Sequence, residues 1–231
     1  IAVSNTPDVL TETTADLTFA LILATSRRLT ESEHFLRSGN WSSWSPTFML
    51  GVDVYGKTLG IYGLGRIGKA VARRARAFNM KVLYHSRTPL TPAEESSLGI
   101  DYVDFDTLLT ESDIVSPHCP LNDETRHIFN ETAFRAMKNS AVFVNTTRGP
   151  VVDEAALASA LHRKEIFAAG LDVFEEEPKV HPDLLTLSNI VLLPHIGSST
   201  FETRGAMADL AAKNIIARLN DIPLPTPVNS L

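Results

Sequence analysis

The stretch LGIYGLGRIGK, residues 59–69, governs how the rest of the sequence is interpreted. It places Gly63, Gly65 and Gly68 in the spacing G-x-G-x-x-G, between an apolar run typical of a β-strand and a segment with helical periodicity. In a dinucleotide site the first glycine allows a tight turn, the second lets the backbone approach a pyrophosphate, and the third lets a helix pack closely on a strand. Ordinary turns also contain such glycines, so the surrounding sequence must distinguish the two interpretations.

The surrounding sequence alternates between strand-like and helix-like segments. Short apolar, β-branched runs predict strands at residues 58–62, 81–84, 113–116, 141–145, 168–173 and 190–193. Helical periodicity and capping residues predict helices at 12–28 with Thr11 as N-cap, 69–78, 131–137, 153–163 with Asp153 as N-cap, and 201–219. This alternation predicts an α/β fold, a Rossmann-type doubly wound parallel sheet with helices on both faces. The sheet context favours dinucleotide binding at the glycines over a structural turn.

The residues after the second predicted strand indicate which dinucleotide is bound. An NAD site usually presents Asp or Glu about 20 residues after the glycines, whereas this sequence reads YHSRT at residues 84–88, with no acidic residue before Glu94. Ser86, Arg87 and Thr88 can donate hydrogen bonds to a ribose 2′-phosphate. NADP(H) is therefore predicted in preference to NAD(H). The alternative is that Arg87 is a solvated loop residue and that the protein discriminates only weakly between NADP(H) and NAD(H).

Composition argues against several other classes of function. A formal net charge of −6 over 231 residues gives no electrostatic reason to expect nucleic acid as a partner. Cys119 is the one cysteine, and no Cys/His grouping has metal-ligand spacing, so we expect a metal-free protein of the reducing cytoplasm. No apolar run approaches the roughly 20 residues of a membrane span, and no membrane partner is expected. The chain begins at Ile1 without an initiator Met or signal pattern, as if within a longer protein.

Three later segments place candidate catalytic groups at strand ends. Arg148 follows the strand AVFVN, Glu177 precedes Pro178 shortly after the next strand, and His195 follows the last one. Each has an ordinary interpretation: a surface ion pair, an acidic turn, or a histidine at the end of a strand. Because parallel sheets bind ligands at the carboxyl ends of their strands, the three together indicate a reaction centre.

These segments together resemble the D-isomer-specific 2-hydroxyacid dehydrogenases, most closely the glyoxylate reductase/hydroxypyruvate reductase branch. The motifs follow the family's order along almost the whole chain: TPDVLTETTADLTFALIL, GNWSSWSP, GLGRIGKAVARR, CPLNDETRH, NTTRGPVVDEAAL, AAGLDVFEEEP and LLPHIGSST. The resemblance implies NADPH-dependent reduction of small 2-oxo acids by hydride transfer, glyoxylate to glycolate or hydroxypyruvate to D-glycerate.

The resemblance also implies domain boundaries. Residues 1–6 would end a flavodoxin-like substrate domain, 7–198 would form the NADP-binding Rossmann domain, and 199–231 would return to the substrate domain as a helix and tail. In the family most of the substrate domain precedes the segment that begins this sequence, so only remnants are expected. The chain alone is then expected to bind NADPH but to turn over poorly, because the cleft would lack one wall to exclude water.

The resemblance assigns catalytic roles by matching position. Arg148 would hold the substrate carboxylate and polarise the 2-oxo group. His195 would be the general acid that protonates the carbonyl oxygen. Glu177 would hydrogen-bond to His195 and favour its protonated form, since a nearby negative charge raises the pKa of an imidazole.

The resemblance places a larger set of residues at the cofactor. The set is Gly63, Gly65, Arg66, Ile67, Gly68, Ser86, Arg87, Thr88, Pro120, Thr125, Thr146, Arg148, Asp172, His195 and Gly197. Residues 65–67 would contact the pyrophosphate and Asp172 the nicotinamide side. Pro120 and Thr146 would make backbone or packing contacts.

The resemblance also implies which residues line the substrate pocket and which form a dimer contact. Ser198 would line the substrate pocket beside Arg148 and His195. The resemblance implies a homodimer formed through helix 12–28 and the loop with Trp41 and Trp44, with Trp44 of the partner subunit reaching toward the substrate pocket. The alternative is that the two tryptophans only fill a helix-rich interface.

Two other classes of function stay open from the sequence, and the first is another enzyme of the same superfamily. A phosphoglycerate dehydrogenase would prefer NAD, which YHSRT opposes, and a formate dehydrogenase would lack the acid-assisted histidine that Glu177 and His195 suggest. From a different class, an NAD(P)-sensing transcriptional corepressor uses the same fold and can retain the catalytic trio.

Overall fold

The computed structural model describes residues 1–229, and a seven-stranded parallel sheet lies at its centre. The strands are β1 (Thr58–Tyr62), β2 (Lys81–His85), β3 (Asp101–Tyr102), β4 (Ile114–Pro117), β5 (Val142–Asn145), β6 (Ala168–Leu171) and β7 (Ile190–Leu192). Their spatial order is β3-β2-β1-β4-β5-β6-β7, so the winding reverses between β1 and β4. A doubly wound sheet binds its ligand at such a reversal. The predicted parallel α/β fold and all predicted strands are confirmed, and β3 was missed.

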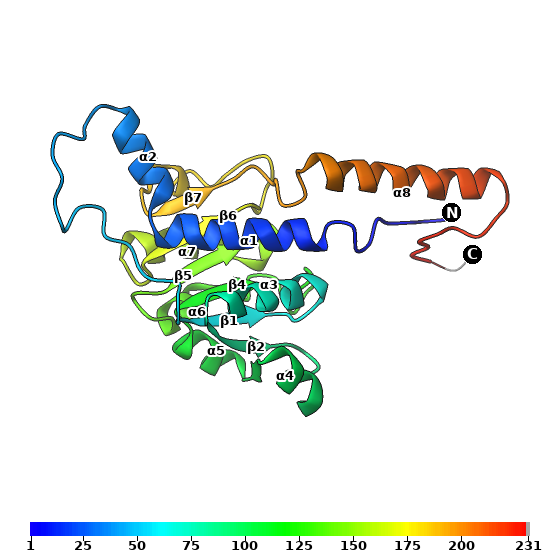
Figure 1. Ribbon diagram of the computed structural model, residues 1–231, viewed down its shortest axis with the longest axis horizontal. Coiled ribbons are helices and arrows are strands. Elements are labelled where there is room, and N and C mark those ends of the chain that lie inside the picture. The colour runs from blue at the N-terminus through cyan, green and yellow to red at the C-terminus, as the bar shows by residue number, and fades with distance from the viewer. Residues whose placement is uncertain (230–231) are drawn as a thin grey trace.

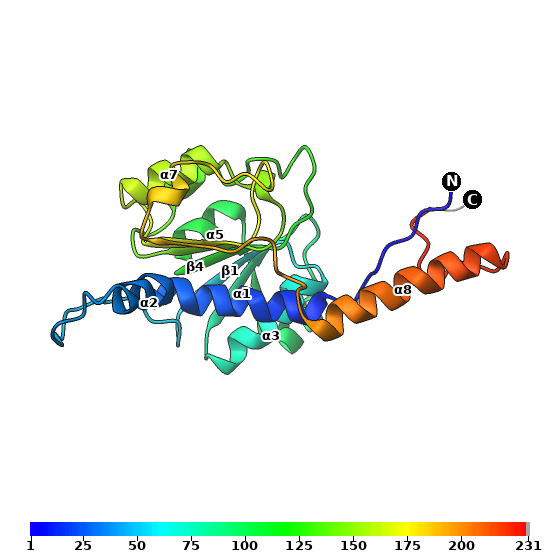
Figure 2. The ribbon, with the colours of Figure 1, turned by 90° about the horizontal axis from the view of Figure 1, so that it is seen from above.

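Helices cover both faces of the sheet (Figure 1, Figure 2). They are α1 (Thr11–Ser26), α2 (Leu29–Arg37), α3 (Arg66–Ala77), α4 (Pro92–Leu98), α5 (Phe105–Glu111), α6 (Glu131–Ala136), α7 (Glu154–His162) and α8 (Phe201–Leu219). Along β5 successive side chains alternate between two cores: Val142 and Val144 pack on the side of α1 and α3, and Phe143 on the side of α5, α6 and α7. Both faces of the strand are therefore buried from solvent, which explains why all of its core-facing residues are apolar.

Helix ends differ from the prediction at two places. Thr11 lies inside α1 and is not its cap, because the cap position is Leu10, whose side chain accepts no hydrogen bond. The predicted helix at 12–28 ends at Ser26, since Arg28 adopts a left-handed backbone with φ of 53° and starts α2 in a new direction. Asp153 is confirmed as the cap of α7, where its side chain accepts from Ala156 N.

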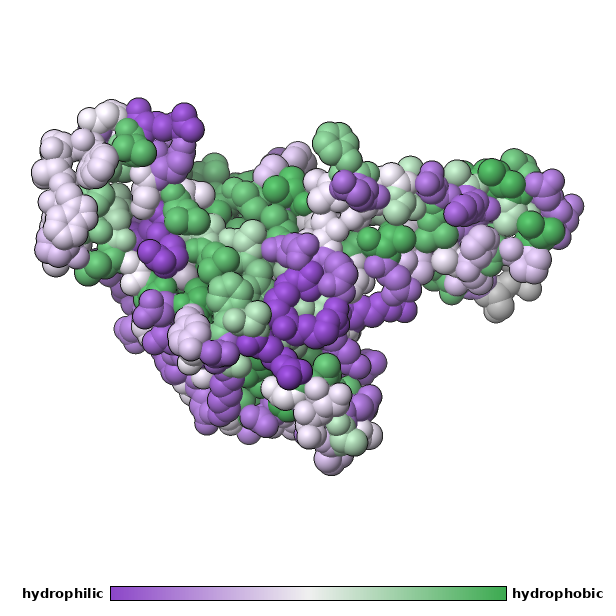
Figure 3. Space-filling model, in the orientation of Figure 1, coloured by the Kyte–Doolittle hydropathy of each residue, from purple (hydrophilic) through white to green (hydrophobic). Residues whose placement is uncertain are grey.

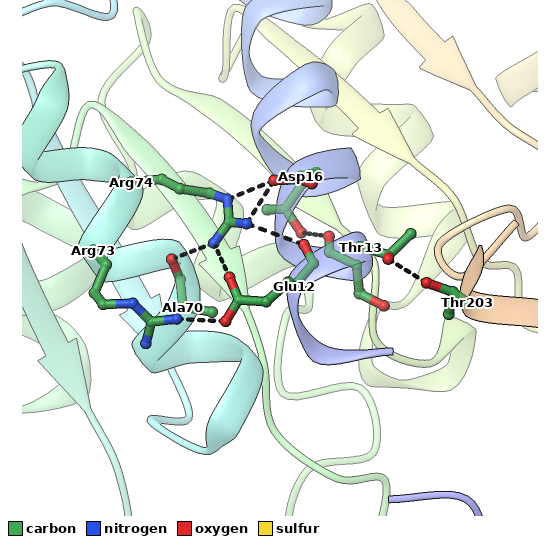
Figure 4. A network of polar contacts seen from close by, with 9 residues as sticks. Glu12, Thr13, Asp16, Ala70, Arg73, Arg74 and Thr203 are labelled. Carbon is green, nitrogen blue, oxygen red and sulfur yellow. Dashed lines mark hydrogen bonds and ion pairs between the residues drawn. The ribbon is translucent and has the colours of Figure 1, made fainter. Parts of the chain in front are cut away.

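Helix α1 is tied to two other elements by polar contacts (Figure 4). The guanidinium of Arg74 on α3 lies 2.8 Å from a Glu12 oxygen and 2.5 Å from an Asp16 oxygen. The hydroxyls of Thr13 and Thr203 lie 2.6 Å apart and join α1 to the start of α8. The Arg74 contacts hold α1 against α3, and the contact between the two threonines holds α1 against the start of α8.

Helix α8 extends away from the sheet (Figure 1, Figure 2), and residues 3–5 pair with residues 226–228. Val228 N donates to Val3 O at 2.8 Å, and Ser4 forms an antiparallel bridge with Pro227. The Phe201 side chain is fully exposed on the first turn of α8. The proposed domain boundaries at residues 6 and 198 stay predictions. Within residues 1–229 each helix, α8 included, is too short or too polar to cross a membrane.

Candidate active site

The glycine-rich turn follows β1 at the reversal of the sheet. Gly63 has a φ of +96°, and a Cβ there would lie 2.6 Å from Cys119 N. A Cβ on Gly68 would lie 2.5 Å from Gly63 O, so α3 could not approach the turn with a larger residue. A Cβ on Gly65 would meet no protein atom within 4 Å. Gly63 and Gly68 are therefore required because a side chain there would clash with nearby backbone atoms. A side chain on Gly65 would instead occupy the open space in front of α3.

That space is suited to an anion. Helix α3 begins at Arg66, earlier than the predicted residue 69, because Gly68 lies within its first turn and hides the helix start from sequence patterns. Gly65 is the N-cap and supplies no side-chain cap, and the first turn holds no acidic residue. The first N–H groups of the helix thus face outward without a side-chain acceptor, which fits a pyrophosphate.

A pocket of about 490 Å³ lies beside this turn and gathers predicted cofactor residues from distant segments. The predicted residues that line it are Gly63, Gly65, Ser86, Arg87, Thr88, Pro120 and Thr125. Ser86 Oγ donates to Thr88 O at 2.7 Å, and Thr125 Oγ1 donates to Pro120 O at 2.7 Å, so both hydroxyls hold loop backbone in place. Glu124 is the acidic residue among those lining it. A pocket of this volume fits a small-molecule or cofactor site.

Several predicted cofactor residues lie elsewhere. Arg66 and Ile67 line a neighbouring pocket that also includes Arg148, and Arg66 pairs with Asp8 at 2.7 Å. Thr146 is buried, with its hydroxyl 2.9 Å from that of Thr18 on α1. Its side chain therefore packs inside the protein, and its predicted contact with the cofactor stays a prediction.

Asp172 has a structural task that sequence reasoning missed. The side chain is 1% exposed, and its two oxygens accept from Ile196 N and Gly197 N, each at 2.7 Å. Burial raises the pKa of this carboxyl above its ordinary value, although the two hydrogen bonds oppose the rise. Asp172 thereby holds the backbone next to His195, a residue whose φ of 52° is left-handed.

His195 and Glu177 form a hydrogen-bonded pair. His195 Nδ1 lies 2.7 Å from Glu177 Oε2, and Phe174 N donates to Glu177 Oε1 at 3.1 Å. Burial raises the pKa of the Glu177 carboxyl, but the hydrogen bonds from His195 and Phe174 outweigh it, and the pKa is lowered overall. With Nδ1 engaged by a carboxylate, Nε2 of the half-exposed imidazole is left for a ligand.

Arg148 lies in the same cleft as this pair. The cleft, of about 570 Å³, is lined by Arg148, Glu177 and His195 together with residues 174–179. Arg148 Nη1 donates to Thr147 O at 2.7 Å, and Asn145 Nδ2 donates to Arg148 O at 3.1 Å, so the end of β5 fixes the arginine backbone. Because Arg148 also lines the pocket at the start of α3, it stands between the glycine-rich turn and His195.

Gly149 is a residue of this site that the sequence analysis did not single out. A Cβ on Gly149 would lie 1.9 Å from the carbonyl carbon and oxygen of Phe174. Only glycine therefore lets the turn after Arg148 rest on the segment that carries Glu177. Its position directly after Arg148 is the sequence signal that could have found it.

The predicted substrate residues differ in their placement. Ser198 follows Gly197 on the loop that Asp172 holds and is half-buried. Trp41 and Trp44 lie on the loop between α2 and β1, which projects from the body of the molecule (Figure 1). Trp44 is 77% exposed and does not line the cleft of its own chain.

This fold, with a glycine-rich turn at the sheet reversal and an acid–histidine pair beside an arginine, defines a Rossmann-type nucleotide-binding domain of an oxidoreductase. The chain belongs to the D-isomer specific 2-hydroxyacid dehydrogenases, because the sequence model of their NAD binding domain matches residues 19–197.

Similar proteins of this family include glyoxylate reductases. Those of Thermococcus litoralis and Pyrococcus furiosus are 54% and 52% identical over 94% and 99% of this chain, and the chain covers 66% and 69% of them. An NADPH-dependent glyoxylate/hydroxypyruvate reductase from Sinorhizobium meliloti, solved with NADP and malonate, superposes with a TM-score of 0.88 at 40% identity; the match covers 99% of this chain and 70% of that one. The chain thus spans about two thirds of the length of its relatives.

Proposed function

We propose that this chain supplies the cofactor-binding domain and the catalytic residues of an NADPH-dependent reductase of glyoxylate and hydroxypyruvate. The observation that carries the proposal is the Glu177–His195 pair in one cleft with Arg148, beside the turn that fits a pyrophosphate. The similarity to glyoxylate reductases supports the class of substrate.

The proposed roles follow from the chemistry of each side chain. The Arg148 guanidinium binds the substrate carboxylate through two parallel hydrogen bonds and orients the 2-oxo group. His195 Nε2 donates a proton to the carbonyl oxygen, and Glu177 stabilises the imidazolium before that transfer. A bound nicotinamide cofactor supplies the hydride. In the oxidation direction His195 accepts the proton from the 2-hydroxyl group.

Glyoxylate-dependent loss of NADPH absorbance by the full-length protein tests the proposal. Steady turnover with glyoxylate or hydroxypyruvate, and much slower turnover with 3-phosphohydroxypyruvate, is the expected result. Tight NADPH binding without consumption would contradict it and favour a cofactor-sensing corepressor.

The preference for NADPH is proposed from Ser86, Arg87 and Thr88, which line the nucleotide pocket. Because a charge-assisted hydrogen bond contributes about 1.5–3 kcal/mol, Arg87→Ala should raise KM for NADPH by roughly tenfold or more and leave KM for NADH unchanged. Arg76→Ala on the exposed side of α3 is the matched control, with no effect expected on either KM. Wild-type preference for NADH, or an unchanged KM for NADPH in Arg87→Ala, would reject the assignment.

The pH profile tests the pairing of Glu177 with His195. Reduction consumes a proton that His195 supplies, so kcat/KM should fall as pH rises. Burial raises the pKa of Glu177, but its hydrogen bonds lower it overall, so the carboxylate is ionised at neutral pH and its negative charge faces the imidazole.

Glu177→Gln should therefore move the fall in kcat/KM to lower pH. Glu176→Gln removes the same charge one residue away, keeps the hydrogen bond to His195, and should move the fall much less. Identical pH profiles for wild type and Glu177→Gln would refute the pairing.

A homodimer through α1 and the adjoining arm is also proposed, with the arm defined as residues 29–57. Hydrophobic residues gather on the face formed by α1 (Figure 3). On the arm the exposed ones are Leu29, Leu36, Trp41, Trp44, Phe48, Leu50 and Tyr55. So much apolar surface on one projecting segment is typical of a protein interface.

Trp44 of the partner subunit would then limit the substrate pocket to small acids. Trp44→Ala should keep the dimer, as measured by light scattering, and raise kcat/KM for bulkier 2-oxo acids relative to glyoxylate by roughly tenfold. Trp41→Ala is the matched control. An unchanged substrate preference in Trp44→Ala would reject this role.

A further inference from the structure

The segment that carries Glu177 is bound to the start of α7 by a reciprocal exchange. Glu175 N donates to Glu154 Oε1 at 2.7 Å, and Glu154 N donates to Glu175 Oε1 at 2.8 Å. The second oxygen of Glu154 accepts from His181 N at 3.2 Å. Glu154 thus contacts the segment at residues 175 and 181, on both sides of Glu177. We call residues 172–181 the Glu177 loop.

Glu154 is not needed to cap its own helix. Asp153 already accepts from Ala156 N at the N-terminus of α7. Glu154 is nevertheless 4% exposed, although a carboxylate pays a large desolvation penalty when it is buried. Both of its oxygens accept hydrogen bonds from N–H groups of the Glu177 loop. These hydrogen bonds compensate for the loss of water around the buried carboxylate.

Two further contacts hold the same loop. His127 Nε2 lies 2.8 Å from Glu175 Oε2, and the Gly149 backbone rests on the peptide between Phe174 and Glu175. Phe174 N in turn donates to Glu177 Oε1. A continuous series of contacts therefore runs from Glu154 to the carboxylate that binds His195.

We propose that Glu154 is a positioning residue for the catalytic pair, because it fixes the Glu177 loop on α7 and so sets the contact between Glu177 and His195. This inference rests on the proposed function. Misplacement of a catalytic group by about 1 Å can cost up to a hundredfold in rate, so Glu154→Ala should lower kcat by about tenfold to a hundredfold. The Kd for NADPH should stay within about twofold, because Glu154 lies outside the nucleotide pocket.

A double-mutant cycle in the full-length protein separates positioning from general stability. If Glu154 acts through Glu177, adding Glu154→Ala to Glu177→Gln should cost far less in kcat than Glu154→Ala costs in the wild type. Glu154→Gln keeps one acceptor oxygen and should lie between wild type and Glu154→Ala. Glu131→Gln on the exposed side of α6 is the control and should leave kcat unchanged. Equal costs in both backgrounds would overturn the proposal.

Hydrogen exchange gives a readout that does not depend on activity. The amides of Phe174 and Glu175 should exchange at least about tenfold faster in Glu154→Ala, or in Glu154→Gln if the alanine variant does not fold, while amides of β1 keep their protection. Unchanged exchange at residues 174–177 would overturn the proposal even if the enzyme reduces glyoxylate. Absence of turnover in the wild type with faster exchange in the variant would instead reject the proposed function and leave the structural coupling standing.

Discussion

Replacement of His195 by alanine is expected to lower kcat for glyoxylate reduction by about a thousandfold, since a positioned general acid typically contributes between a hundredfold and ten-thousandfold. The physical reason is the geometry of the pair. Nδ1 lies 2.7 Å from Glu177 Oε2, so Nε2 is the ring nitrogen left to donate the proposed proton, and no other imidazole lines this cleft among the described residues. Steady-state kinetics with saturating NADPH measures the loss.

The same variant should still bind NADPH with a Kd close to that of the wild type. Its nucleotide pocket is lined by other residues, with the glycine-rich turn and Arg87 among them. His162→Ala on α7 is the matched control and should retain wild-type kcat. Retention of more than about a tenth of the activity by His195→Ala would reject His195 as the acid.

Substitution of Arg148 is expected to have the second large effect on catalysis. Arg148→Lys should lower kcat/KM for glyoxylate by about a hundredfold, because an ammonium cannot make the two parallel hydrogen bonds that a guanidinium makes to a carboxylate. Arg148→Ala should cost about tenfold more, because the positive charge that polarises the 2-oxo group is lost as well. Both substitutions should lower kcat/KM for the 2-oxo acid and change KM for NADPH only little.

The exposed Arg163 at the end of α7 offers a matched control. Arg163→Lys changes only a surface ion pair with Glu131 and Glu165, which contributes little to stability, and should leave kcat/KM unaltered. Equal kcat/KM in wild type and Arg148→Lys would show that a simple positive charge is sufficient and would refute bidentate binding.

The central sheet was predictable because its strands are covered on both faces. Strands such as β5 are apolar throughout, and this pattern is visible without any tertiary information. Strand β3 has two residues, both exposed, so it offers no hydrophobic pattern. Helix α2 was missed because it is short and none of its residues is buried, and the left-handed turn at Arg28 that separates it from α1 has no glycine to mark it.

The short helices α4 and α5 were missed although capping residues mark both of them. Thr91 and Glu94 form a capping box at α4, and Asp104 caps α5 through Thr107 N. Each of these helices has seven residues, which is too short for a clear helical periodicity to be recognised in the sequence.

The candidate catalytic residues could be predicted for a geometric reason. Arg148, Glu177 and His195 each follow a strand, and the carboxyl ends of parallel strands meet at one edge of the sheet. The direction of each side chain could not be read in the same way. Asp172 also ends a strand, but its carboxylate turns inward to Ile196 and Gly197.

Long-range contacts between loops could not be predicted from the sequence. Glu154 and Glu175 are separated by a helix and a strand, and nothing in their local patterns indicates that each accepts the other's N–H group. The close contact of Gly149 with Phe174 depends in the same way on how two loops meet. Such contacts require the loop geometry, which follows from the packing of the whole sheet.

The product formed from hydroxypyruvate tests the central claim most directly. The full-length protein, incubated with NADPH and hydroxypyruvate, should form D-glycerate in an amount equal to the NADPH consumed, and both should be abolished by His195→Ala. Chiral chromatography of the product, run beside the absorbance measurement, gives both quantities. Formation of L-glycerate, or NADPH binding without any glycerate, would contradict the account.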